Sequence, residues 1–328
     1  GAWDVNATAS NYDLHNTAYD TTLAKSVVYT GTAYGTNFLS TVNYTNTTAG
    51  GGSGLNARAF GMSSDGTKAI VIGDGAKMHS LSLSTAFDIS TATVTVSNGP
   101  SGWPTNSLGG YVKSDGTKMW VVDYTQGSFT EYNLNTAWDV SSKSSVATHT
   151  TNVPSQIIDV YWKPDGMMCF VADYQNADIY QFTVTTAFDF STAGTPYTYS
   201  MTSVAGSLMN IQFKPDGTEL YASINASTIY AVTKISLNTA WDLSGTVTES
   251  AHIADLSAAP YSISTDNGFF EYYNNGGTAF YAAYGNDTIY QFNMQTSSTG
   301  LALGTGSFAS TDVGKRIQGN GGDVILTS

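Results

Sequence analysis

Basic side chains are scarce in this sequence. Its 328 residues include 12 Lys and Arg against 25 Asp and Glu, so the formal net charge is −13. This balance disfavours nucleic-acid binding, because contact with a phosphate backbone needs a basic surface. Long apolar runs are lacking as well, and no stretch approaches the roughly 18 residues of a membrane helix. We therefore expect neither nucleic acid nor membrane insertion.

Cysteine is nearly absent. The single Cys169 cannot form a disulfide within the chain, so stability has to come from packing and strand pairing. Cys169 lies four residues after Asp165, and the residues at the same offset after two related aspartates are Ala69 and Met119. An apolar core position is therefore favoured over a nucleophile.

The residues that are abundant point to strands. The sequence has 33 Gly and 21 Tyr, is 41% hydrophobic and only 11% charged, and is rich in Thr, Ser and Asn. Helical proteins have a different profile, dominated by Leu, Ala, Glu and Lys. An aromatic content of 12% argues against disorder. These numbers predict a large all-β protein.

Two short motifs recur with one period. Asp-Gly pairs begin at steps of 50, 50 and 51 residues, at Asp65, Asp115, Asp165 and Asp216, and Asn275-Gly276-Gly277 takes the analogous place later. An aromatic residue followed by Asp recurs at steps of 51, 50 and 53 residues, in Phe87-Asp88, Trp138-Asp139, Phe188-Asp189 and Trp241-Asp242. Because the two motifs share a period, the chain is built of internal repeats.

Each repeat has the pattern of four short strands. Residues 110–113 enter an Asp-Gly turn and residues 119–122 leave it, which is a hairpin signature because Asp-Gly accepts the positive φ angles of tight turns. A third strand follows, as at residues 179–182, and then a fourth that is rich in Thr and Val, as at residues 93–96. Four antiparallel strands in one repeat are typical of a propeller blade.

The repeats predict an all-β fold, a β-propeller of four-stranded antiparallel blades. Five blades are favoured, and six are the alternative if residues 21–57 form a degenerate blade. A β-sandwich would also be all-β, but it would not require a constant period.

The two ends of the chain suggest how the ring closes. Residues 12–20 resemble the loop that elsewhere precedes a fourth strand, and no such loop follows the strand around Tyr290. We expect an N-terminal strand, with Lys25–Tyr29 as the candidate, to pair with that strand and leave no open edge. The expected domains are a propeller over residues 1–298 and a connector over residues 299–328.

The repeat phrases resemble a known kind of module. Residues 83–92, 213–221 and 179–182 are similar to the repeats of β-propeller modules in bacteriophage tail-fibre and virion proteins, especially those of marine phages. The Gly-rich residues 310–326 resemble the connector that leads into the next domain of a tail fibre, so we expect the natural chain to continue. The resemblance supplies no catalytic residue.

The resemblance implies a non-enzymatic structural or adhesive module, located in a virion or outside the cell. Its loops would face other virion proteins, or a protein or glycan on a host surface, within a larger assembly. A bacterial extracellular or cell-surface scaffold and a glycan-binding propeller are the alternatives. A propeller hydrolase or lyase would need three unlike polar or acidic side chains that converge in the channel.

Sequence patterns for metal, cofactor or catalytic sites are lacking. The four histidines are scattered, with no pair at a zinc-ligand spacing. Asp123 and Asp173 occupy equivalent positions eight residues after their turn aspartates, but Gly73, Ile224 and Tyr284 stand at or near that position in other repeats. No acidic ring emerges, so we expect no enzyme, metal or cofactor. Acids that recur in every repeat are interpreted as turn-forming and capping residues.

Aromatic residues in the loops are candidates for surface binding. Tyr- and Asn-rich loops combine rigid contact area with adaptable hydrogen bonds, which suits glycans and proteins equally. The alternative for each candidate is packing within a blade or ordinary exposure. The candidates are Trp103, Tyr124, Tyr174 and Tyr284.

Overall fold

The computed structural model describes twelve stretches of the chain: residues 38–45, 56–75, 77–97, 101–150, 156–202, 206–225, 230–255, 269–273, 279–284, 288–294, 316–319 and 322–325. Strands dominate these residues. The described helices are three short 3-10 turns, η1 (Ile89–Thr91), η2 (Val140–Ser142) and η3 (Phe190–Thr192). None of them has the length or apolar character to cross a membrane.

Four of the sheets in the described residues each consist of four consecutive antiparallel strands, in the order in which they occur along the chain. The first contains β2 (Ala57–Met62), β3 (Lys68–Gly73), β4 (Lys77–Leu83) and β5 (Ala92–Ser97). The second contains β6 (Gly110–Val112), β7 (Lys118–Asp123), β8 (Ser128–Leu134) and β9 (Lys143–Thr150). The third contains β10 (Ile157–Trp162), β11 (Met168–Asp173), β12 (Asp178–Thr183) and β13 (Tyr197–Ser200). The fourth contains β14 (Ser207–Phe213), β15 (Glu219–Asn225), β16 (Tyr230–Leu237) and β17 (Val247–Asp255).

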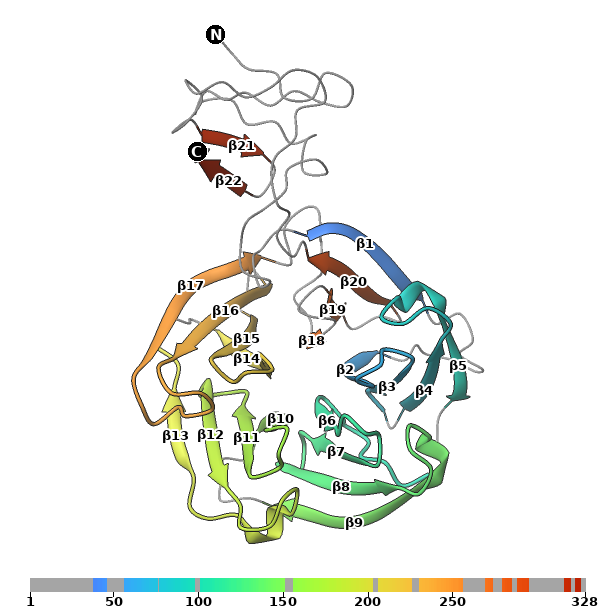
Figure 1. The fold of residues 1–328 in the computed structure, drawn as a ribbon. Coiled ribbons are helices and arrows are strands. Elements are labelled where there is room, and N and C mark those ends of the chain that lie inside the picture. The colour runs from blue at the N-terminus through green and yellow to red at the C-terminus, as the bar shows by residue number, and fades with distance from the viewer. Residues whose placement is uncertain are drawn as a thin grey trace. The chain divides into compact units, whose positions relative to one another are not determined.

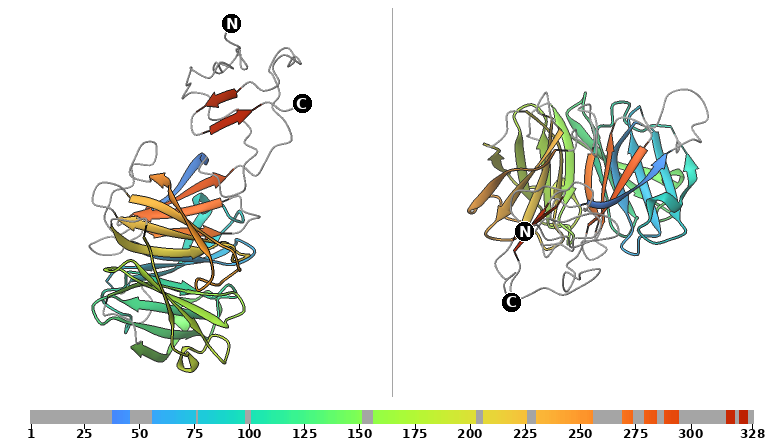
Figure 2. Two further views of the ribbon diagram at one scale, coloured as in Figure 1. Left: turned by 90° about the vertical axis from the view of Figure 1, so that its left-hand side faces the viewer. Right: turned by 90° about the horizontal axis from the view of Figure 1, so that it is seen from above.

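These sheets stand in a ring, as the blades of a β-propeller do (Figures 1 and 2). The first strands β2, β6, β10 and β14 lie on the inside and contact one another in that order, while the fourth strands lie on the outside. Burial follows the same order, because β10 is buried along its whole length and β5 alternates between half-buried and exposed residues. The predicted propeller of four-stranded antiparallel blades is confirmed.

A further four-stranded sheet joins distant parts of the chain. It has the order β1-β20-β19-β18, from β1 (Phe38–Thr45), β20 (Thr288–Met294), β19 (Ala279–Tyr284) and β18 (Phe269–Tyr273). Its β18 contacts both β14 and β2. The four sheets of consecutive strands form four blades, and the predicted count of five, which would require this sheet to be a blade of the same ring, is not supported by this arrangement.

An N-terminal strand lies beside the strand that contains Tyr290, as the closure hypothesis requires. That strand is β1, whereas the candidate Lys25–Tyr29 lies outside the described residues. The alternative with six blades drew on residues 21–57 for a separate blade. Residues 38–45 of that segment instead share a sheet with β18 to β20.

The Asp-Gly pairs close the hairpin between the first and second strands of each blade. The Oδ1 atom of Asp115 accepts hydrogen bonds from the N–H of Thr117 at 3.0 Å and from its hydroxyl at 2.7 Å. Gly116 has a φ of +70°, in the left-handed region that favours glycine. The other three turns share this form, with φ of 71°, 75° and 73° at Gly66, Gly166 and Gly217. The structural interpretation of the turn acids is confirmed.

The aromatic-Asp motif packs on the same glycine. The N–H of Trp241 donates to the carbonyl oxygen of Gly217 at 2.9 Å, and Trp241 itself has a φ of +65°. Asp242 accepts a hydrogen bond from the N–H of Ser244 at 2.9 Å and caps the next turn. The equivalent bond joins Phe87 to Gly66, Trp138 to Gly116 and Phe188 to Gly166. The two motifs of each repeat therefore form one structural unit at one end of the blade.

Hydrophobic clusters fill the spaces between neighbouring sheets. The cluster between the third and fourth sheets contains Phe170, Phe213 and Trp241, with ring centroids 4.4 Å apart for the first pair and 4.8 Å for the second. The cluster between the second and third sheets contains Cys169 with Trp120. Cys169 is fully buried, which raises the pKa of its thiol well above the ordinary value. Its predicted core position is confirmed.

The chain divides into two compact units. The larger holds residues 42–274 and 280–291, and with them the four sheets of consecutive strands. The smaller holds residues 1–41, 275–279 and 292–328 and contains the hairpin of β21 (Arg316–Gly319) and β22 (Gly322–Ile325). The division at residue 298 stays a prediction.

Candidate functional site

Trp103, one of the four surface-binding candidates, belongs to the core. Its side chain is 5% exposed, and its ring lies 4.5 Å from that of Tyr132, centroid to centroid. The ammonium group of Lys143 lies 4.1 Å from the Trp103 ring centroid. The expectation that Trp103 offers a binding surface is therefore wrong, because the segment between the first two sheets folds its indole onto β8.

Tyr124 and Tyr174 come from equivalent turns between the second and third strands of neighbouring blades. Their rings meet edge to face, with centroids 5.6 Å apart, and both rings are partly buried against the cluster between the third and fourth sheets. Burial raises the pKa of Tyr124, and nearby Tyr174 and Asp173 raise it further. Tyr284 ends β19, and its side chain lies outside the described residues. A binding role for these three tyrosines stays a prediction.

The equivalent acids Asp123 and Asp173 hold those same turns. The carboxylate of Asp173 accepts hydrogen bonds from the N–H of Gln175 and the side-chain amide of Asn176, both at 2.8 Å. Asp123 accepts a bond from the N–H of Gln126 at 3.1 Å. Both carboxylates act as turn caps.

No group of three or more His, Cys, Asp and Glu side chains is placed to hold a metal ion within the described part of the chain. His79 shares a hydrogen bond of 3.2 Å with Ser97 of the neighbouring strand. His149 lies 3.6 Å from the carboxylate of Glu131. These two histidines thus take part in contacts within their own blades.

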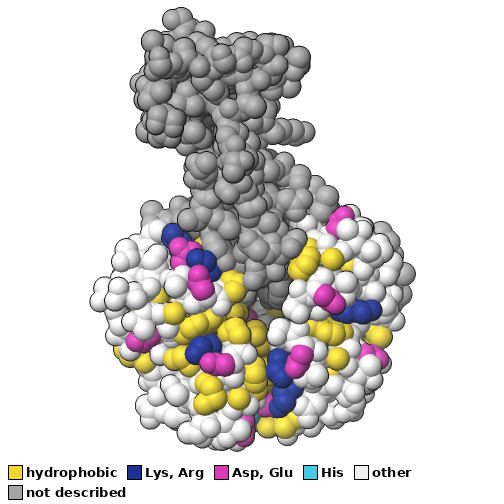
Figure 3. Space-filling view, viewed as in Figure 1, with side chains coloured by type: hydrophobic (Ala, Val, Ile, Leu, Met, Phe, Trp, Pro, Cys, Tyr) yellow, Lys and Arg dark blue, Asp and Glu magenta, His cyan; other side chains and the backbone are white. Residues whose placement is uncertain are grey.

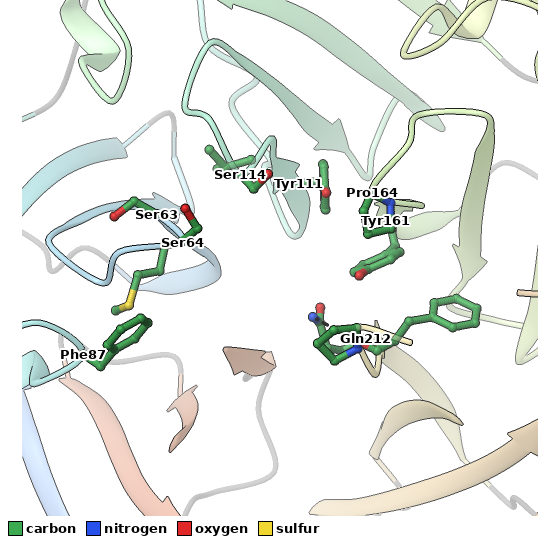
Figure 4. Close-up of a pocket in the computed structure, with 12 residues that line it drawn as sticks. Ser63, Ser64, Phe87, Tyr111, Ser114, Tyr161, Pro164 and Gln212 are labelled. Carbon is green, nitrogen blue, oxygen red and sulfur yellow. Dashed lines mark hydrogen bonds between the residues drawn. The ribbon is translucent and has the colours of Figure 1, made fainter. Parts of the chain in front are cut away.

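A pocket of about 270 Å³ opens at the mouth of the ring, beside the Asp-Gly turns (Figure 4). Four blades contribute to its wall, and no lining residue carries a formal charge. Figure 3 shows exposed hydrophobic side chains around the centre of this face, with paired acidic and basic groups farther out. The lining consists of Met62, Ser63, Ser64, Phe87, Tyr111, Val112, Ser114, Tyr161, Pro164, Gln212, Phe213 and Pro215.

One position of the repeat contributes a residue to this pocket from three of the blades. The residue four before each turn aspartate is Gly61, Tyr111, Tyr161 or Gln212 in the successive blades. The last three line the pocket. At Gly61 an added Cβ would lie 2.4 Å from the Cβ of Val112, so that blade leaves no room for a side chain. This position is Gly, Tyr, Tyr or Gln while the Asp-Gly pair beside it is constant, and that contrast was visible in the sequence.

The rim of the pocket carries both polar and apolar residues. Exposed residues directly before the turn aspartates are Ser64 and Ser114 in the first two blades, and Pro164 and Pro215 in the next two. The lysines beside them are each paired with the turn aspartate two residues later, over 2.7 to 2.9 Å, in Lys113–Asp115, Lys163–Asp165 and Lys214–Asp216. These ion pairs neutralise the rim in three blades, whereas Asp65 of the first blade is held by hydrogen bonds from Ser63 and Thr67.

A buried carboxylate lies deeper on the inner strands. Asp159 and Tyr161 are two residues apart on β10, so their side chains point to the same face. The Oδ2 atom of Asp159 accepts bonds from the side-chain amide of Asn210 at 2.7 Å and from the N–H of Ile211 at 3.0 Å, and its Oδ1 accepts from the N–H of Gly110 at 3.1 Å. Asp159 thereby links three blades.

Burial raises the pKa of Asp159 to about 7, against the lowering effect of its N–H donors. Asn210, the side chain hydrogen-bonded to Asp159, is an amide and cannot act as an acid or base. No second carboxylate contacts Asp159 in the described residues. General acid–base hydrolysis uses two groups with different pKa values beside one substrate.

Comparisons with known proteins add little to this description. No protein-family model matches the sequence, and no curated protein sequence matches it. Among solved structures, hydrazine synthase of Kuenenia stuttgartiensis is similar at 17% identity and a TM-score of 0.44, over 73% of this chain and 58% of that one. A protein of Lactobacillus plantarum is similar at 14% identity and a TM-score of 0.42, over 71% of this chain and 65% of that one. The chain thus spans less than two thirds of these proteins, and similarities of this size say nothing about activity.

Proposed function

We propose that the protein is a non-enzymatic recognition module, in which the propeller is a frame and the neutral mouth pocket is the binding site. The observation that carries this proposal is the contrast within the repeat: the Asp-Gly pair of the turn is constant, whereas the residue four before it is Gly61, Tyr111, Tyr161 or Gln212 in the successive blades. Residues needed for folding recur, and residues needed for one specific ligand have no reason to recur.

The setting that we propose follows the resemblance of the repeats to phage tail-fibre and virion modules. In that setting the module is a structural or adhesive part of a larger assembly and faces another virion protein, or a protein or glycan of the host surface. A bacterial cell-surface scaffold with the same blades is the second candidate. Uncharged, aromatic pockets serve either setting.

An activity screen tests the non-enzymatic character. The full chain is incubated with panels of glycosides, lactones and phosphate esters, with Asp159→Asn as the matched variant, and we expect no turnover. Turnover that the Asp159→Asn variant abolishes would refute the non-enzymatic proposal in favour of a propeller hydrolase.

Mass spectrometry of purified virus particles and of washed cell envelopes from the protein's source tests the setting. We expect the intact chain in the particles, and the cell-surface alternative expects it in the envelopes. Recovery in neither fraction would refute both proposed settings.

We also infer that the fifth sheet is the fifth blade of the ring. In the third blade, the Gln181 side-chain oxygen of β12 accepts a bond from the N–H of Leu243 in the fourth, at 2.7 Å. Gln291 of β20 has the same place in the same Ile-Tyr-Gln-Phe phrase, and its oxygen accepts from the N–H of Ile89 in the first blade at 2.7 Å. Each acceptor reaches the residue that follows the aspartate of an aromatic-Asp motif.

A second contact supports this closure. The hydroxyl of Tyr281 in β19 donates to the carbonyl oxygen of Phe87 at 2.7 Å, and the Tyr281 ring lies 5.4 Å from that of Phe60. Phe60 and Phe87 belong to the first blade. The fifth sheet therefore meets the first blade in the way that the third blade meets the fourth.

A further inference from the structure

We propose that the mouth pocket binds a neutral sugar ring of a polysaccharide, which deepens the recognition function proposed above and rests on it. Three properties of the pocket carry this inference: its charge, the difference between the serine and proline positions of its rim, and the rigidity of its aromatic wall. Each limits the ligand independently.

Charge is the first property. None of the twelve lining residues is charged, and the lysines at the rim are already paired with aspartates. A ligand with a carboxylate, sulfate or phosphate group would lose hydration here without gaining a counter-charge. The pocket therefore selects a neutral ligand and excludes nucleotides and acidic sugars.

The second property is the difference between the serine and proline positions of the exposed rim. The exposed hydroxyls of Ser64 and Ser114 make no hydrogen bond with another described residue, so they can bond a ligand (Figure 4). The proline rings of Pro164 and Pro215, at the same turn position in the next two blades, offer only apolar surface. A pyranose combines the same two kinds of surface, with C–H groups on its ring faces and hydroxyls at its edge. A wholly apolar ligand would leave the serine hydroxyls unused.

The third property is rigidity. The Tyr161 ring meets the Tyr111 ring edge to face at 5.3 Å and is backed by Phe213 at 5.4 Å and Trp241 at 6.2 Å. Tyr161 is only 7% exposed, so its ring is held before any ligand arrives. A wall fixed in advance saves the cost of ordering side chains on binding. The pocket volume of about 270 Å³ lies just below the range of about 300–1,000 Å³ typical of small-molecule sites, which suits a single ring rather than a cofactor.

The test is an array of neutral, uronic-acid and sulfated oligosaccharides together with proline-rich peptides, probed with the full chain. We expect binding to neutral oligosaccharides alone, with little dependence on salt. The double variant Ser64→Ala/Ser114→Ala changes only exposed rim hydroxyls, so its fold is retained. Its affinity should fall about tenfold, the loss expected for one or two hydrogen bonds. The control is Tyr197→Ala, which alters a tyrosine on the outer strand β13 that is 42% exposed, and its affinity should not change.

Several outcomes would overturn the proposal. Binding restricted to anionic sugars or to peptides would refute the neutral sugar, and unchanged affinity in the double variant would refute the site. Absence of binding to every neutral oligosaccharide at millimolar concentration would refute the ligand class. These failures differ from a failure of the recognition function, which would show as turnover, or as absence of the chain from both particles and envelopes.

Discussion

The indole of Trp241 occupies the place that any side chain at residue 217 would need. A Cβ built on Gly217 would lie 2.1 Å from the Nε1 atom of Trp241, and the φ of Gly217 is +73°. The same overlap with an aromatic ring occurs at Gly66, Gly116 and Gly166. Glycine is therefore required twice over at these turns, by the backbone angle and by the ring above it.

Three glycine substitutions separate these two requirements. Gly194 has neither a positive φ nor a close neighbour, since its Cβ would meet nothing nearer than 3.8 Å. Gly75 has a φ of +70°, but its Cβ would meet only the Cε atom of Lys77, at 3.9 Å. We expect Gly194→Ala to be nearly neutral, Gly75→Ala to cost about 1–2 kcal/mol, and Gly217→Ala to cost at least about 3 kcal/mol. Urea unfolding of the three variants measures this, and equal losses for Gly75→Ala and Gly217→Ala would contradict the role of the ring.

Asp159 gives the folded protein a dependence on pH. Its pKa is about 7 in the folded chain, against 3.8 for an ordinary aspartate. Between these values the folded protein keeps a proton that the unfolded chain has released. The contribution of Asp159 to stability is therefore greatest at acid pH, falls as the pH rises from about 4 to about 7, and is constant above.

Asp159→Asn isolates this effect. As the pH rises across that range, the unfolding free energy of the parent protein should fall by up to about 4 kcal/mol relative to that of the variant. The pKa of the turn acid Asp65 is lowered to about 2 by hydrogen bonds from Ser63 and Thr67. Because such turn acids are present in both proteins, their own pH-dependent contributions cancel in the difference. Unfolding in urea at several pH values provides the measurement. A difference that does not change with pH would show that Asp159 is ionised throughout.

Closure of the ring by the fifth sheet predicts that Gln181 and Gln291 contribute similarly to the stability of the fold. Gln291→Ala would leave the N–H of Ile89 without its acceptor, and Gln181→Ala would do the same to Leu243. A buried N–H that loses its partner costs about 1–3 kcal/mol, so both variants should lose stability by similar amounts. A neutral Gln291→Ala beside a costly Gln181→Ala would mean that the fifth sheet is not part of the ring.

The strand β1 should protect the edge of β20. Deleting residues 1–45 removes β1, and an unpaired strand edge promotes aggregation. Deleting residues 1–30 keeps β1 and is the matched control. We expect the first truncation to form large species in light scattering and the second to stay monodisperse. Equal behaviour of the two would count against closure by β1.

Cys169 should be inert while the protein is folded. Its side chain is fully buried, and burial raises the pKa of the thiol, so neither access nor thiolate is available. Iodoacetamide should label it only after unfolding, as followed by mass spectrometry. Rapid labelling of the folded chain would show that the space between the second and third sheets opens.

The sequence predicted those features that depend on residues adjacent in the chain. The Asp-Gly pairs predicted the hairpins because the required φ angles depend on the residue type itself. That Trp241 covers Gly217 could not be predicted, since it depends on how the third strand of a blade returns to the first turn. Trp103 was misassigned for the same reason, because its burial is decided by Tyr132, which is distant in sequence.

The pocket was missed because the repeats were compared for what they share. Tyr111, Tyr161 and Gln212 occupy one repeat position, and no single residue type stands at that position in all four blades. Asp159 likewise stands alone as an acid within the apolar strand Ile157–Trp162. An isolated acid in a buried strand was a usable signal, although its partner Asn210 in the next repeat became evident only from the structure.

The position four residues before each turn aspartate has a consequence for how such a protein can diversify. A mutation there changes one pocket-lining side chain and leaves the hairpin, its capping carboxylate and its covering aromatic ring in place. Duplicating a repeat would copy the blade together with one such side chain. New specificities can therefore arise by single-codon changes on an unaltered architecture, as long as the new side chain does not clash with the next blade, as one at Gly61 would with Val112.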